Sequence, residues 1–263
     1  MLEAVLSFGV SICILSVFQA VLVALPAARE MPVLRRLRSG WWGLIPVASV
    51  LAFVFGARAL SGVANGLAYL ALVAVPPLAA GAAGWAMRGA RPWLAVVVVP
   101  LFALAWVDRH GLAGEAAALV LMGLSCVTLG VLLVAVTPRL LVKIGIVAMA
   151  IADTWLVVSD LLEAPNNALN AAAPIAHLPA LQRTVFGSAV MGYGDLFIAA
   201  LFGALLAAQG RRAVRAAVAV GLLSLASNAL FFAVNELPAT VPVALVLLAG
   251  EARAAARRRR PSR

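Results

Sequence analysis

Long apolar runs separated by short polar segments cover almost the whole chain. The runs span residues 4–25, 42–62, 66–87, 92–107, 113–136, 140–162, 184–208, 214–235 and 237–250. A membrane-spanning helix needs about 20 mostly apolar residues, whereas a membrane strand alternates apolar and polar positions, which these runs do not. We therefore predict an all-α polytopic membrane protein with nine transmembrane helices. Because the second, fourth and ninth runs are interrupted or short, eight is the alternative count.

Composition supports the same class. The chain of 263 residues is 65% hydrophobic and 11% charged, with a mean hydropathy of +1.08. Roughly a quarter of the residues in soluble domains are charged, so a water-soluble domain is excluded. The net charge of +10 does not indicate nucleic acid, because the basic residues lie between the apolar runs. We expect the lipid bilayer as the surrounding partner and the cell membrane as the location.

The basic residues also predict the orientation. The segments 26–41, 88–91, 137–143, 209–215 and 251–263 contain 17 of the 20 Lys and Arg residues. Basic residues accumulate on the cytoplasmic side, so nine helices place the amino terminus outside and the carboxyl terminus in the cytoplasm. We divide the chain into a five-helix scaffold (1–137), a four-helix part (138–250) and a basic tail (251–263). The arginines at 257–260 either bind anionic lipid or act as an orientation signal.

Three aspartates lie inside the apolar runs, where a carboxylate costs a few kcal/mol and indicates function. Asp153 follows Lys143, at the cytoplasmic face, by ten residues, which places it about 15 Å deep. Asp195 follows Arg183, at the outer face, by twelve residues, which places it about 18 Å deep if the run is helical. The depths sum to roughly the 30 Å hydrocarbon thickness, so both acids should lie at one level. Asp160, two turns farther out, is the alternative first acid.

Two carboxyl groups at one level in an apolar place should share a single proton. The ionised one then activates water and the protonated one donates to a carbonyl, as in aspartic proteases. Two short motifs accompany the acids: Gly192, Tyr193 and Gly194 directly before Asp195, and Pro238, Ala239 and Thr240 at the start of the last run. Glycine leaves backbone bare and proline leaves an acceptor unpaired, which a substrate could use. No metal-ligand spacing or phosphate loop occurs, so we expect no metal and no cofactor.

Together these motifs resemble those of the presenilin and signal peptide peptidase family of intramembrane aspartyl proteases. The resemblance implies Asp153 and Asp195 as catalytic residues, with Gly192, Tyr193, Gly194, Pro238, Ala239 and Thr240 at the substrate. It also implies transmembrane helical peptides or signal-peptide remnants as substrates. The orientation matches the signal peptide peptidase branch. The chain departs from the family at Ala152, where a tyrosine is usual, and at Thr240, where a leucine is usual.

Three other interpretations remain open on the sequence. A type IV prepilin peptidase-like protease would use Asp160, followed by Pro165 and Asn166, as its first acidic motif. A proton-coupled transporter or sensor would use the intramembrane carboxylates as a proton relay. An inactive family member would only bind membrane helices. The pattern does not specify an oligomeric state.

Overall fold

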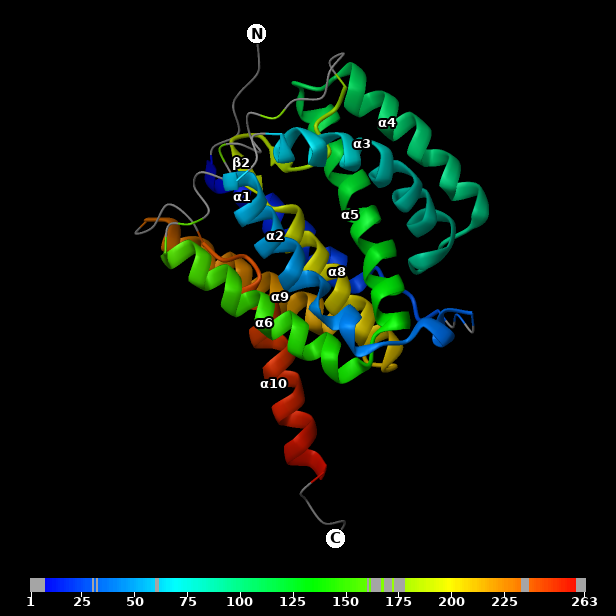
Figure 1. Cartoon of the computed structure of the whole chain (residues 1–263), viewed down its shortest axis with the longest axis vertical. Helices are drawn as coiled ribbons and strands as arrows, with labels where there is room; N and C mark the ends of the chain where they lie inside the picture. Colours follow the sequence, from blue (N-terminus) through cyan, green and yellow to red (C-terminus); the bar gives the residue numbers. More distant parts are fainter. Residues whose placement is uncertain are drawn as a thin grey trace.

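The computed structural model describes residues 8–29, 31, 33–59, 62–159, 161, 167, 172, 178–232 and 237–258. Within these residues the chain is mostly helical, as predicted, and forms nine α-helices (Figure 1). Their bounds are α1 Phe8–Ala24, α2 Ile45–Ala59, α3 Val63–Gly81, α4 Val98–Val107, α5 Leu112–Val136, α6 Arg139–Val158, α8 Tyr193–Ala208, α9 Ala213–Ser227 and α10 Val241–Arg258. A π-helical turn, Ala82–Ala86, extends α3, and a 3-10 turn, Pro92–Val97, precedes α4.

Several helices have the length and composition of membrane spans. Among the described residues, four apolar helical stretches are long enough to cross a membrane: Val63–Ala86, Leu112–Val136, Arg139–Val158 and Ala213–Phe231. The apolar helices Phe8–Ala24, Pro92–Val107 and Tyr193–Ala208 are shorter. These stretches suggest a membrane protein, in agreement with the predicted class.

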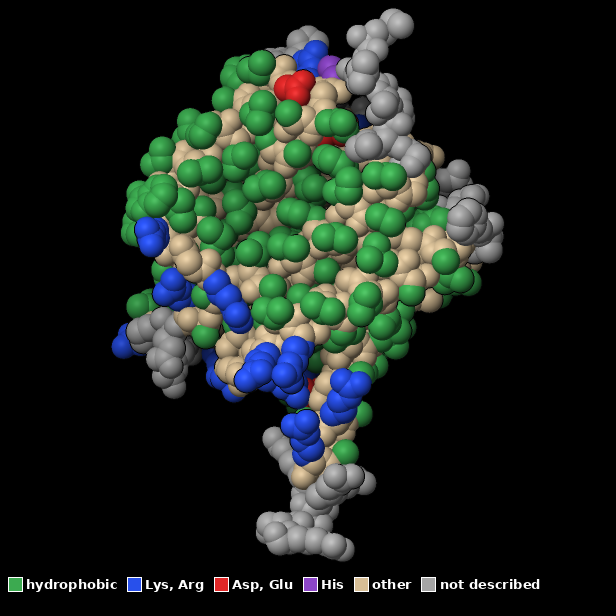
Figure 2. Space-filling model, turned by 180° about the vertical axis from the view of Figure 1, so that it is seen from behind, with side chains coloured by type: hydrophobic (Ala, Val, Ile, Leu, Met, Phe, Trp, Pro, Cys, Tyr) green, Lys and Arg blue, Asp and Glu red, His purple; other side chains and the backbone are tan. Residues whose placement is uncertain are grey.

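The surface has the same character. Large aliphatic side chains are exposed along the helices, for example Val73 at 73%, Val107 at 85% and Val158 at 81%. Figure 2 shows apolar side chains over most of one face, with Lys and Arg gathered toward the end from which α10 projects. Apolar surface of this extent marks an interaction site, and a lipid bilayer fits it.

Helix α8 forms the centre of the packing. It contacts α5 on one side and α1 on another, and almost all its side chains from Leu196 to Ala207 are buried. Two glycines permit this approach. A Cβ at Gly130 of α5 would lie 3.0 Å from the carbonyl carbon of Ala200, and a Cβ at Gly203 would collide with the carbonyl oxygen of Val23. Small residues let membrane helices pack this closely.

The prediction of one helix over 184–208 is wrong in its first part. Strands β1 (Thr184–Phe186) and β2 (Ala189–Met191) form an antiparallel hairpin, and α8 begins only at Tyr193. Gly187 adopts a positive φ of 59° in the turn, which favours glycine, and its N–H donates to Glu115 Oε2 over 2.7 Å. The helical depth of Asp195 counted from Arg183 therefore does not hold.

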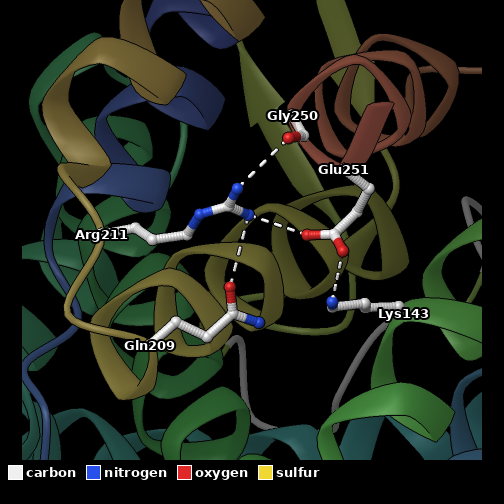
Figure 3. Close-up of polar contacts among 5 residues, drawn as sticks. All are labelled: Lys143, Gln209, Arg211, Gly250 and Glu251. Carbon is white, nitrogen blue, oxygen red and sulfur yellow. Dashed lines mark hydrogen bonds and ion pairs between the residues drawn. The ribbon is translucent and has the colours of Figure 1, made fainter. Parts of the chain in front are cut away.

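The last helix also differs from its predicted bounds of 237–250, because α10 begins at Val241 and continues to Arg258. Ala and Arg, which dominate its end, are good helix formers. Glu251 of α10 is bound by two cations (Figure 3). Lys143 Nζ of α6 donates to Glu251 Oε2 at 2.6 Å, and Arg211 Nη1 donates to Glu251 Oε1 at 2.8 Å. Arg211 also donates to the Gly250 carbonyl and to Gln209. This Glu251 cluster (Lys143, Arg211 and Glu251) joins α6, the α8–α9 connection and α10.

Candidate active site

One large cavity contains most of the predicted site residues. Its volume is about 1150 Å³, and its walls come from the hairpin, from the segment before α10 and from eight helices: α1, α2, α3, α5, α6, α8, α9 and α10. Its lining is mainly apolar. The predicted site residues that line it are Asp153, Gly192, Tyr193, Gly194, Asp195, Pro238 and Ala239. A mainly apolar cavity with a few converging polar groups is the usual form of a binding site.

The structure brings Asp153 and Asp195 together. Both line this cavity, and they are close enough for their charges to interact. Their levels also agree when both are measured from the basic end of the molecule. Asp153 is 14 residues along α6 from Arg139 and Asp195 is 13 residues from Ala208 at the end of α8, so each lies about 20 Å from that end.

Asp195 lies in the first turn of α8. Gly192 precedes the helix, and its backbone N–H donates to Asp195 Oδ2 at 3.1 Å. The Asp195 N–H in turn donates to the Gly192 carbonyl at 3.2 Å. A carboxylate is favoured at a helix start because unpaired N–H groups point toward it. The Gly-Tyr-Gly-Asp motif therefore ends the hairpin, starts α8 and aims the carboxyl group into the cavity.

Asp153 lies toward the carboxyl end of α6 and is held by the residue directly before α10. The Thr240 hydroxyl donates to Asp153 Oδ2 at 2.6 Å. Thr240 is fully buried and does not line the cavity, whereas Pro238 and Ala239 do. The contact of Thr240 with a substrate stays a prediction, and the structure adds a contact of its hydroxyl with the acid. The departure from leucine at this position supplies the hydroxyl that makes it.

Gln19 of α1 is a site residue that the sequence reasoning missed. Its side chain is fully buried, and its amide Nε2 donates to the Ala239 carbonyl at 2.9 Å and to the Asp195 carbonyl at 3.4 Å. Its Oε1 accepts from the Ser224 hydroxyl at 3.4 Å. One amide therefore connects α1, α8, α9 and the segment before α10. The available signal was a glutamine inside an apolar run, where polar side chains mark function or helix contacts.

Tyr193 is oriented by α5. Its hydroxyl lies 2.8 Å from Ser125 Oγ, and Ser125 donates to the Met122 carbonyl at 2.7 Å. On the opposite side, a Cβ at Gly194 would lie 3.6 Å from Met149 Cε of α6, so α6 passes beside this motif. These contacts hold the start of α8 between α5 and α6.

Other predicted elements lie outside the described residues, namely Asp160, Pro165 and Asn166 of the alternative acidic motif. Within the described part of the chain, no three His, Cys, Asp or Glu side chains are grouped to hold a metal ion. Asp153 and Asp195 are the acidic side chains among the described residues that line the cavity.

No family model matches the chain, and no curated protein or solved structure matches it. The function proposed below rests on the residues of the cavity and their geometry.

Proposed function

We propose that this chain is an intramembrane aspartyl protease of the presenilin and signal peptide peptidase kind, in which Asp153 and Asp195 form the catalytic pair. The observation that carries the proposal is that two acids from different apolar helices line one cavity at the same level. Buried carboxylates are costly in an apolar place, and a pair of them indicates acid–base chemistry.

The proposed topology has nine spanning helices, with the amino terminus outside and the basic end in the cytoplasm. The clustering of Lys and Arg toward the end with α10 supports this orientation (Figure 2). At about 20 Å from the cytoplasmic helix ends, the acids would lie within the hydrocarbon, which is about 30 Å thick. A substrate bond at that depth belongs to a membrane-embedded peptide.

The pair would act by sharing one proton, because two like charges at short range are not both ionised. The ionised carboxylate takes a proton from water as its oxygen attacks the peptide carbonyl carbon. The protonated carboxyl gives its proton to the carbonyl oxygen, which yields a tetrahedral diol. When the C–N bond breaks, one acid protonates the leaving amine and the other accepts a proton from the diol, so the pair regains its single shared proton.

The cavity fits an apolar peptide segment in extended form. A helical peptide bond is shielded by its own hydrogen bonds, so a substrate helix must first unwind locally. The unwound segment then needs polar backbone partners inside an apolar cavity. Gly192, Gly194, Pro238 and Ala239 line the cavity beside the acids, and their carbonyl oxygens, each of which can accept two hydrogen bonds, would supply such partners.

The decisive experiment compares Asp195→Ala with the unchanged chain, both reconstituted in liposomes with a membrane-helix reporter peptide. We expect cleavage to be abolished while the protein stays folded by circular dichroism. Asp108→Asn is the matched control, because Asp108 accepts the Gly114 N–H outside the cavity and asparagine preserves an acceptor there. Full activity of Asp195→Ala would refute the catalytic role.

A proton-coupled transporter or sensor would use the same carboxylates differently. A transition-state analogue of aspartic proteases that carries a photoreactive group separates the two. Labelling that requires both Asp153 and Asp195 supports the protease, whereas proton flux without cleavage or labelling supports the transporter. An inactive helix-binding family member would retain the reporter helix without cleaving it.

A further inference from the structure

A second, smaller cavity lies away from the acids, toward the basic end of the molecule. Its volume is about 330 Å³, and three arginines line it: Arg29 after α1, Arg38 before α2 and Arg139 at the start of α6. The other described lining residues have apolar side chains and come from positions 27, 28 and 31 and from the ends of α5 and α8. These residues are Ala27, Ala28, Met31, Val131, Val134, Ala135, Ala204 and Ala208.

Two of the three guanidinium groups are held in place by backbone carbonyls. Arg29 Nε donates to the Trp85 carbonyl at 2.8 Å, and Arg139 Nη2 donates to the Ala208 carbonyl at 2.8 Å. A guanidinium has five N–H donors, so each retains others for a ligand. Arg38 is exposed. Fixed arginines lose little side-chain entropy on binding, and their planar geometry matches a phosphate.

The charge of this arginine pocket (Arg29, Arg38 and Arg139) contrasts with that of the Glu251 cluster at the same end. There, one carboxylate accepts from both Lys143 and Arg211 (Figure 3). No acidic side chain is among the described residues that line the arginine pocket. Three cations in a pocket whose other lining side chains are apolar favour an anion that also carries an apolar part.

The position of the pocket indicates where that anion comes from. Trp41 and Trp42 follow Arg38 closely and are 81% and 40% exposed. Exposed tryptophans occur at the level of lipid headgroups, and basic pockets between helices on the cytoplasmic side bind anionic headgroups. We propose that the arginine pocket binds the phosphate of an anionic phospholipid, with the glycerol and the first acyl carbons against Met31, Val131 and Val134.

Native mass spectrometry of the full chain in non-ionic detergent tests this site. We expect phosphatidylglycerol to be retained at least about tenfold over phosphatidylcholine. The variant Arg29→Gln/Arg38→Gln/Arg139→Gln should lose this preference. The control Arg91→Gln/Arg212→Gln/Arg253→Gln removes the same charge from residues that do not line the pocket and should keep it. Equal loss in both variants, or no preference in the unchanged chain, overturns the proposal.

A competition experiment and a single variant make the test specific. Excess glycerol phosphate should not displace the lipid, because it lacks the acyl chains; displacement at equal concentration would identify a soluble anion site instead. If the triple variant does not fold by size-exclusion chromatography, the single change Arg38→Gln replaces it. Arg38→Gln should weaken retention about tenfold, and unchanged retention contradicts the site. These measurements do not depend on proteolysis.

Discussion

Two places in the molecule hold carboxylates in opposite ways. Glu251 lies at the basic end and is bound by two cations, Lys143 and Arg211. Asp153 is ten residues beyond Lys143 along α6, so it lies about 15 Å deeper, and Asp195 lies at the same level. Neutral donors hold the two aspartates there, the Thr240 hydroxyl and the Gly192 N–H. The two cations neutralise the charge of Glu251, and these ion pairs join α10 to α6 and to the α8–α9 connection. The two aspartates instead both line one mainly apolar cavity, an arrangement suited to moving a proton.

The largest difference between the two places should appear in turnover, when each carboxylate is replaced by its neutral amide. We expect Asp153→Asn and Asp195→Asn each to lower turnover about 10⁴-fold, because each removes one member of an acid–base pair. The double variant should be no worse than either single one, since the pair acts as a unit. Glu251→Gln should leave turnover within about threefold, because it carries no proton in the reaction. Single-turnover cleavage of a reporter helix measures all four.

The hydrogen bond from the Thr240 hydroxyl to Asp153 offers a finer test. A hydrogen bond to a charged group contributes about 1.5–3 kcal/mol, so Thr240→Val should lower kcat roughly 10- to 100-fold. Thr240→Ser keeps the hydroxyl and should restore most of the activity. Thr128→Val is the control, because it removes a 2.7 Å hydrogen bond to the Leu78 carbonyl from a residue that does not line the cavity. Equal kcat for Thr240→Val and Thr128→Val would remove Thr240 from the site.

Gln19 should affect both the fold and the reaction. Gln19→Leu leaves the Ala239 carbonyl without its 2.9 Å donor and should lower the free energy of unfolding by about 1 kcal/mol. Gln19→Glu should cost more, because a carboxylate oxygen would face two carbonyl oxygens. Thermal unfolding in detergent gives the stability, and kcat measured separately from KM gives the effect on site geometry. A change in stability with kcat intact would assign Gln19 to packing alone.

The smallest effect should come from the pH dependence of the Glu251 cluster. The Lys143 hydrogen bond, aided by Arg211, holds the pKa of Glu251 below its ordinary value. A lowered pKa means that the stabilisation is present above about pH 4.3 and is lost as the pH falls through the folded-state value. Since the side chain is 36% exposed, we expect less than about 1 kcal/mol. Thermal unfolding at several pH values, with Glu251→Gln as the control, measures it.

The sequence predicted the helical class because apolar runs of about 20 residues have few alternatives in lipid. It also singled out Asp153 and Asp195, since ionisable residues are rare inside such runs. It misjudged the start of the seventh run, because hydropathy does not separate a short apolar hairpin from a helix. The β-branched residues Thr184, Val185 and Val190 and the glycine turn were the local signals for strands.

Contacts between distant helices were decided only by the tertiary structure. Gln19 and Asp195 are 176 residues apart, and Thr240 and Asp153 are 87 apart, so no local pattern could pair them. Hydrophobicity selects which segments enter the bilayer, but it is the same for every apolar face and does not choose neighbours. Close packing at glycines and the hydrogen-bonding needs of buried polar groups make that choice, and both depend on three-dimensional geometry.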